Sequence, residues 1–154
     1  MSRLNHVYEN DRELIPEYRC RKPIVAVYQT GNLLYTSGHG PENQLTGVPI
    51  YQGRIGRDLT LEEGYLAARE CGVILLGALK DYLGSLDRVK GIVKATALVN
   101  VDGDFCQLDE VMDGFSDLMT EVFEERGYHV RTVMGTHNMP NHNIPVEIEL
   151  IAEI

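Results

Sequence analysis

The sequence predicts one α+β domain in which two helices pack on the same face of a single β-sheet. The chain has 154 residues, about the length of one domain. Two segments have the periodicity of amphipathic helices, and several shorter ones alternate apolar and polar residues as strands do. Because both helices follow an opening hairpin and are separated by one long strand, the economical packing places both on one face of the sheet.

The N-terminal part predicts an arm, a hairpin and a loop. Residues 1–22 are polar and mixed in charge, so we expect an arm or edge element followed by the domain, 23–154. Residues 24–29 and 33–37 are rich in β-branched and aromatic residues and flank two turn residues, the pattern of a hairpin. A loop rich in Gly and Pro follows, and residues 51–55 could supply one more short strand.

A capping box predicts where the first helix begins. In Thr60-Leu-Glu-Glu63 the Thr hydroxyl accepts from the third helical N–H, and Glu63 reaches back to the cap. Gly84 ends the helix. Between these limits the apolar positions recur by threes and fours, which places them on one stripe: Leu61, Tyr65, Ala68, Gly72, Leu75, Leu79 and Tyr82.

The second half predicts a strand, a helix and two closing strands. Residues 88–101 alternate, with Val93, Ala95, Ala97, Val99 and Val101 on one face and Lys94, Thr96 and Asn100 on the other. An amphipathic helix covers about 108–126 and stops at Gly127. Strands follow near 129–137 and 145–153. On the last strand apolar residues alternate with carboxylates, so the acidic side lies on the face without helices, which a second subunit would cover.

Composition and charge exclude several classes of protein. The chain has 14 Lys and Arg against 23 Asp and Glu, a formal charge of −9, which opposes nucleic acid. No run reaches the length of a membrane helix and the first residues lack a signal peptide, so we expect a cytoplasmic protein with reduced cysteines. His137 and His142 match no ligand spacing, and we expect neither metal nor cofactor.

Arg131 and Glu147 are the candidates for chemistry. An Arg on a strand can bind a ligand carboxylate bidentately, or it can form a structural ion pair with a C-terminal Glu. Glu147 and Glu149 lie two apart on one strand face. Paired acids of this kind can do acid–base work, but alternating Glu is also typical of a solvated face. The residues alone leave both alternatives open.

Three stretches together carry a family resemblance. The first is Gly-Asn-Leu-Leu-Tyr-Thr-Ser-Gly at residues 31–38, followed by Pro41. The second pairs Asp-Leu-Thr-Leu-Glu-Glu-Gly at 58–64 with Leu-Asp-Arg-Val-Lys-Gly-Ile-Val-Lys at 86–94, and the third is Arg131 followed by Pro-Val-Glu-Ile-Glu-Leu-Ile-Ala at 145–152. Over about 23–154 the chain resembles the Rid (RidA/YjgF) family of reactive-intermediate deaminases.

The resemblance implies a mixed sheet with two helices on one face, and a homotrimer whose sheets form a closed barrel with ligand clefts between subunits. The well-studied members of this family hydrolyse small enamine or imine acids to a keto acid and ammonia without metal or cofactor. By the same resemblance Arg131 binds the substrate carboxylate, Glu147 positions the water, and the backbone at Gly38 and Val133 binds the substrate. The substrate-binding candidates are Ser37, Gly38, Asp113 and Val133.

Three positions depart from the family pattern. Ile24 stands where deaminases usually have Tyr, Val133 where many have Cys, and Asp113 where an Asn is expected. A carboxylate at position 113 opposes an anionic ligand unless it is protonated or turned away. We therefore keep a non-catalytic module that binds or senses a small metabolite as the alternative, while the charge of −9 makes an endoribonuclease the least favoured function.

Overall fold

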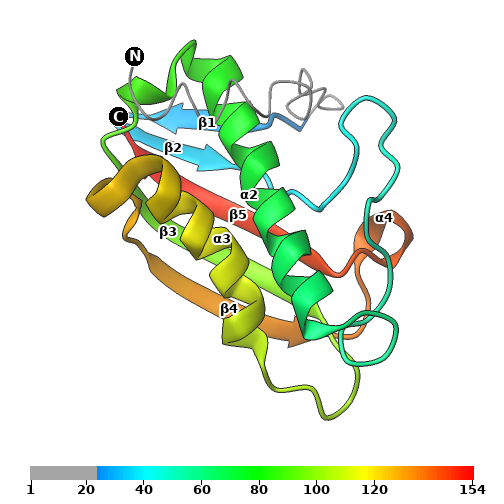
Figure 1. The fold of residues 1–154 in the computed structure, drawn as a ribbon. Helices are drawn as coiled ribbons and strands as arrows, with labels where there is room; N and C mark the ends of the chain where they lie inside the picture. The colour runs from blue at the N-terminus through cyan, green and yellow to red at the C-terminus, as the bar shows by residue number, and fades with distance from the viewer. Residues whose placement is uncertain (1–23) are drawn as a thin grey trace.

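Five strands, two long helices and three short ones make up residues 24–154, the part of the chain that the computed structural model describes (Figure 1). The predicted arm of residues 1–22 lies outside the described residues. The strands are β1 (Val27–Thr30), β2 (Leu33–Thr36), β3 (Gly91–Asn100), β4 (Val130–Thr136) and β5 (Val146–Glu153). The helices are α2 (Leu61–Leu83), α3 (Leu108–Phe123) and α4 (Pro140–Asn143), with 3-10 turns η1 (Leu86–Arg88) and η2 (Glu124–Gly127).

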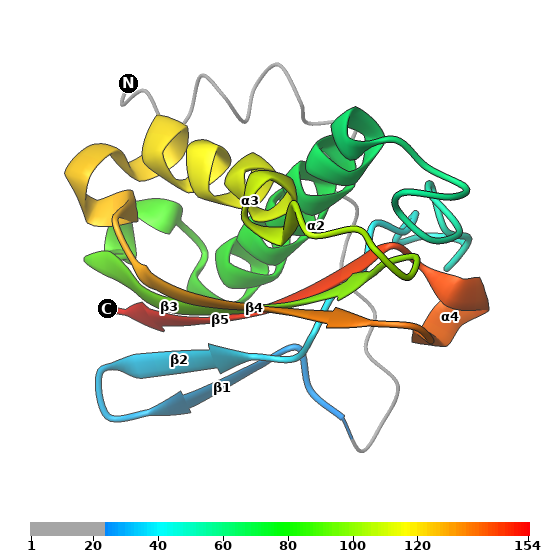
Figure 2. The same cartoon turned by 90° about the horizontal axis from the view of Figure 1, so that it is seen from below.

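The sheet is mixed, and its last strand along the chain is its central one. The strand order is β1-β2-β5-β3-β4. The β3–β4 pair is parallel and the other pairs are antiparallel. Helix α3 connects the parallel pair, as such a pair requires. Both long helices lie on one face of the sheet (Figure 2), which confirms the predicted α+β arrangement.

The capping box at the start of α2 forms as predicted. The backbone N–H of Glu63 donates to Thr60 Oγ1 at 3.2 Å, and the Thr60 N–H donates to Glu63 Oε2 at 2.8 Å. At the other end Gly84 takes the left-handed conformation, with φ of 79°, and its N–H donates to the carbonyl of Lys80. The sequence therefore predicted both limits of this helix.

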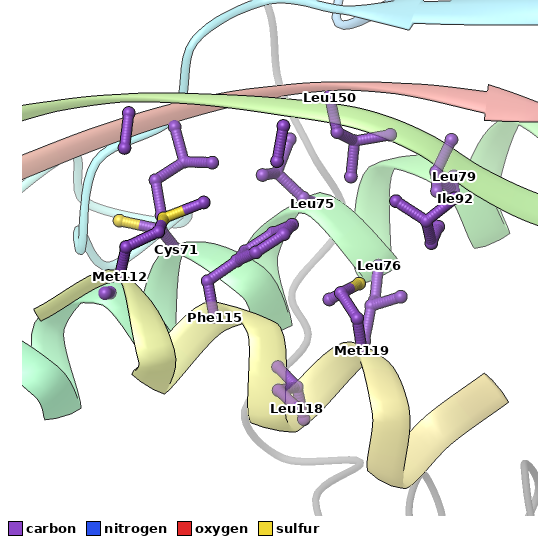
Figure 3. Close-up of a cluster of buried hydrophobic side chains, with 14 of the residues drawn as sticks. Cys71, Leu75, Leu76, Leu79, Ile92, Met112, Phe115, Leu118, Met119 and Leu150 are labelled. Atoms are coloured by element: carbon purple, nitrogen blue, oxygen red, sulfur yellow. The ribbon is translucent and has the colours of Figure 1, made fainter. Parts of the chain in front are cut away.

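The hydrophobic core fills the space between the two helices and the sheet (Figure 3). Two glycines bring the helices close together. A Cβ at Gly114 of α3 would overlap the carbonyl of Tyr65, whereas a Cβ at Gly72 of α2 would meet the end of the Leu118 side chain. Side chains from both helices and from the central strands pack in this layer: Cys71, Leu75, Leu79, Ile92, Phe115, Met119 and Leu150.

Some boundaries and faces differ from the prediction. The predicted strand at 51–55 is wrong, because the region forms only isolated bridges, such as those of Ile55 with Leu59 and Val101. Helix α3 ends at Phe123, before Gly127, because Glu124 takes a positive φ of 56°.

The residues of β3 that point to the core also differ from the strict alternation predicted. The register between β3 and β5 shifts between Ile92 and Lys94. Ile92 is consequently buried, with 3% of its surface exposed, whereas Val93 is 40% exposed. Asn100, predicted on the polar face, is fully buried, and its Nδ2 donates to Asn143 Oδ1 at 2.8 Å.

The other face of the sheet carries none of the helices of residues 24–154 (Figure 2). Tyr35, Leu98 and Met134 are exposed apolar side chains on its strands. The acidic side of β5, with Glu147 and Glu149, lies on this face as predicted, because Val146 and Ile148 point into the core. None of the helices in the described range is long and apolar enough to cross a membrane.

Candidate functional site

Arg131 lies on β4 and points to the helix side of the sheet. Its partner on β3 is Ala95, which is buried beneath the helices, and paired residues in a sheet share a face. Arg131 Nη1 donates to Asp113 Oδ1 at 2.7 Å, and Nη2 donates to Asp109 Oδ1 at 3.1 Å. Arg131 therefore forms a structural ion pair, one of the two predicted alternatives. Its partners, however, are aspartates of α3 and not a C-terminal Glu.

A serine and a histidine extend the Arg131 network. Arg131 Nη1 also donates to Ser116 Oγ at 3.1 Å, and that oxygen lies 3.2 Å from His129 Nε2. His129 Nδ1 lies 2.7 Å from the carbonyl of Gly127, which can only accept, so Nδ1 is the donor in that contact. Sequence reasoning missed these partners, although Asp109, Asp113 and Ser116 are spaced by four and three on one face of α3.

Glu147 lies on β5 beside Gly38. A Cβ at Gly38 would overlap the Glu147 carboxylate, so the glycine leaves the space that this side chain occupies. The hydroxyl of Ser37 donates to the carbonyl of Val25 at 2.6 Å, which fixes the strand that leads into Gly38. The structure thus brings together two of the predicted site residues, Gly38 and Glu147, and Ser37 precedes Gly38 in the chain.

The carboxyl groups of Glu147 and Glu42, which lie near each other, both have a raised pKa. Burial, and then the nearby charge of Glu149, raise the pKa of Glu147. Burial also raises the pKa of Glu42, which receives a hydrogen bond from Asn141 and is close enough to Glu147 for their charges to interact. Glu42 and Asn141 were not predicted. Asn141 belongs to three successive residues with positive φ, which no simple sequence pattern announces.

Arg131 and Glu147 do not meet within one chain. Arg131 pairs with Ala95 of β3, whereas Glu147 pairs with Leu98 of the same strand. Residues three apart on a strand point to opposite faces and are separated by about 10 Å along it. A site that contains both side chains therefore requires two copies of the protein.

The other two predicted site residues, Val133 and Asp113, both lie on the Arg131 side of the sheet. Val133 pairs with Ala97 and so shares the helix side with Arg131, on the edge strand β4. Asp113 contacts Arg131 directly. Ile24, where the family pattern has Tyr, is 61% exposed just before β1.

An open acidic groove lies next to the Arg131 network, between the N-terminal halves of α2 and α3. Its volume is about 600 Å³. It is lined by Thr60, Leu61, Glu62, Tyr65, Glu110, Asp113 and Asp117. Asp113 thus faces Arg131 and the groove together.

A mixed sheet with both helices on one face, an arginine on its edge strand and a glycine beside a glutamate on its other side agree with what the resemblance to the Rid family implies. Comparison with known proteins agrees. Residues 20–154 match the model of the family described as "YjgF/chorismate_mutase-like, putative endoribonuclease". The chain belongs to this YjgF/Rid family.

Individual relatives cover most of the chain. Protein TCP17 of Trypanosoma cruzi is 36% identical over 126 residues, which are 81% of this chain and 77% of that protein. The crystal structure of a "putative endoribonuclease" from Shewanella oneidensis is similar with a TM-score of 0.88 at 30% identity, covering 98% of this chain and 99% of the other. A protein of unknown function from Agrobacterium tumefaciens gives a TM-score of 0.86 at 30% identity, covering 99% and 94%.

Proposed function

We propose that the protein hydrolyses a small enamine or imine to a carbonyl compound and ammonia, at a cleft built by two copies of the chain. With an imino acid, the product is a keto acid. The observation that carries the proposal is the placement of Glu147: a half-buried carboxyl group with a raised pKa, beside a glycine that leaves room for it, in a chain of the YjgF/Rid family.

The chemistry needs one group that both gives and takes a proton. A water oxygen adds to the imine carbon, the C=N bond breaks, the nitrogen leaves as ammonia and a C=O bond forms. Glu147 in its acid form can protonate the imine nitrogen, and its carboxylate can take a proton from the attacking water. Its raised pKa supports this double role, because both forms are then populated closer to neutral pH than for an ordinary Glu.

The exposed sheet face supports a cleft between copies. Tyr35, Leu98 and Met134 offer an apolar surface on that face, and β4 is an edge strand. A second copy that covers this face can bring its own β4, with Arg131, toward Glu147 of the first. The family resemblance adds that the assembly is a homotrimer with a closed central barrel.

The first test is an assay against a panel of imines released in place. An amino-acid oxidase supplies 2-imino acids, an amine oxidase supplies imines without a carboxylate, and ammonia release is followed with and without the protein. Glu147→Gln is expected to lower the rate at least about 100-fold. Glu149→Gln, on the same strand and face, is the matched control and should keep most of the activity. No acceleration across the panel, or full activity in Arg131→Ala, refutes the proposal.

The second test addresses the two-copy cleft. Arg131→Ala and Glu147→Gln are each expected to be inactive alone. If each cleft takes Arg131 from one copy and Glu147 from another, subunits mixed and reassembled in equal amounts regain about a quarter of the clefts. A mixture that stays inactive, although mass spectrometry shows hybrid assemblies, contradicts this geometry. RNA incubated with the wild type should remain intact, because the charge of −9 opposes a polyanion.

A further inference from the structure

The resemblance assigns a substrate carboxylate to Arg131, but two protein carboxylates already contact this guanidinium. Asp113 and Asp109 lie at 2.7 and 3.1 Å from its nitrogens. The Arg131 side chain is only 25% exposed, whereas those of Asp113 and Asp109 are 49% and 79% exposed. Together the three side chains carry a charge of −1 at neutral pH, so the group no longer presents a net positive charge to a ligand.

Replacing these aspartates by a ligand carboxylate at Arg131 would add little binding free energy. Arg131 would give up charge-assisted hydrogen bonds to Asp113 and Asp109 and form bonds of the same kind to the ligand. The displaced aspartates would then stand close to the incoming anion without their partner. A ligand with no negative charge breaks no ion pair and meets no charge repulsion, because it leaves the bonds of Arg131 to Asp113 and Asp109 in place.

The surroundings on both sides of the proposed site are acidic. The groove beside Asp113 is also lined by Glu62, Glu110 and Asp117, and none of its lining residues is Lys or Arg. On the other side Glu42 and Glu147 interact, with Glu149 on the same strand face as Glu147. The local potential thus repels a small anion, does not oppose a neutral molecule and attracts a protonated imine.

We infer that the site takes an imine that carries no carboxylate, and that Asp113 is the residue that determines this specificity. The inference rests on the proposed function and names its substrate class. Asp113 Oδ1 accepts from Arg131, and a carboxylate has further lone pairs with which it can accept an N–H of the imine or its protonated form. Arg131 then acts as a positioning residue that fixes Asp113, and not as an anion binder.

A matched pair of substrates tests the inference by kinetics. Propan-1-imine, released from propylamine by an amine oxidase, and 2-iminobutanoate, released from 2-aminobutanoate by an amino-acid oxidase, differ only in the carboxylate. The wild type is expected to have the higher kcat/KM for propan-1-imine. Asp113→Asn should raise kcat/KM for 2-iminobutanoate at least about tenfold, which is about 1.4 kcal/mol, without raising that for propan-1-imine.

Asp117→Asn is the control, because it removes the same charge one turn further along α3 and lines the same groove, where Asp117 accepts from the Tyr65 hydroxyl. It should give no such gain. A wild type that prefers 2-iminobutanoate, an unchanged preference in Asp113→Asn, or an equal gain in Asp117→Asn overturns the inference, while the proposed deamination stands.

Binding of stable compounds separates the two proposals when no imine is turned over. Calorimetry with 2-oxobutanoate and its amide, 2-oxobutanamide, should show no preference for the carboxylate in the wild type. Asp113→Asn should bind 2-oxobutanoate at least about tenfold more tightly, and adding Arg131→Gln should cancel this gain. If these binding changes are seen and no imine is turned over, the proposed deamination is refuted, whereas the inference that Asp113 excludes a carboxylate is supported. A wild type that prefers 2-oxobutanoate, or no gain in Asp113→Asn, overturns the specificity.

Discussion

Replacing Gly114 with Ala should destabilise the protein, although alanine is the better helix former. A Cβ at this position would overlap the carbonyl of Tyr65, which is backbone and cannot rotate away. Overpacking of this kind costs about 1–3 kcal/mol, and the gain from replacing a helical Gly offsets about 0.5–1 kcal/mol of it. The rigid obstacle places the cost near the upper end, so we expect a net loss of about 2 kcal/mol in the free energy of unfolding.

Gly72→Ala at the same helix–helix contact is the matched variant. Its Cβ would meet the ends of the Leu118, Phe115 and Met119 side chains, which can shift. We expect this variant to stay within about 1 kcal/mol of the wild type. Urea unfolding at one fixed protein concentration measures both variants, and the melting temperature of Gly114→Ala should fall by about 4–8 °C. If Gly114→Ala is as stable as the wild type, or no less stable than Gly72→Ala, the argument from the rigid backbone contact is wrong.

Three further predictions concern a cap, a titration and a thiol. Thr60→Ala should cost about 1 kcal/mol in the same unfolding assay, because it removes the acceptor for the Glu63 N–H, and Thr60→Ser should keep most of the stability. Because the folded state keeps a proton on Glu147 above its ordinary pKa of 4.5, ionisation of this group weakens folding as pH rises through the raised pKa. The free energy of unfolding of Glu147→Gln, minus that of the wild type, should therefore be larger at pH 7 than at pH 4. An equal difference at both pH values argues against the raised pKa. Iodoacetamide should label the exposed Cys106 quickly and Cys71 only after unfolding. Cys71 is fully buried, and burial raises the pKa of its thiol well above the ordinary value. Peptide mapping by mass spectrometry measures the order of labelling, and labelling of Cys71 before Cys106 contradicts this prediction.

Local signals in the sequence were sufficient where a structure depends on near neighbours. The capping box of Thr60 and Glu63 and the left-handed Gly84 need only residues within one or two turns, and both limits of α2 were predicted. The alternation of Val146, Ile148 and Leu150 likewise predicted which side of β5 is acidic. These features depend on periodicity and on short-range hydrogen bonds, which a single sequence contains.

Features that depend on a partner strand or helix were not predictable in the same way. The register shift near Val93 arises from pairing with β5, so strict alternation put this residue on the wrong face. The partners of Arg131 follow from the crossing of α3 over β4, and the sequence suggested glutamates that are not its partners. That Arg131 and Glu147 face opposite ways follows from two registers on β3, neither of which a single sequence reveals.

The central position of β5 has a consequence for the order of events during synthesis. A ribosome makes β5 after the other four strands, yet β5 joins the hairpin of β1 and β2 to the pair of β3 and β4. Until residues 146–153 have left the exit tunnel, the nascent chain holds two separate half-sheets with unpaired edges. The sheet can therefore be completed only after β5 has emerged, and until then the edges of the two half-sheets are open to aggregation and to chaperones.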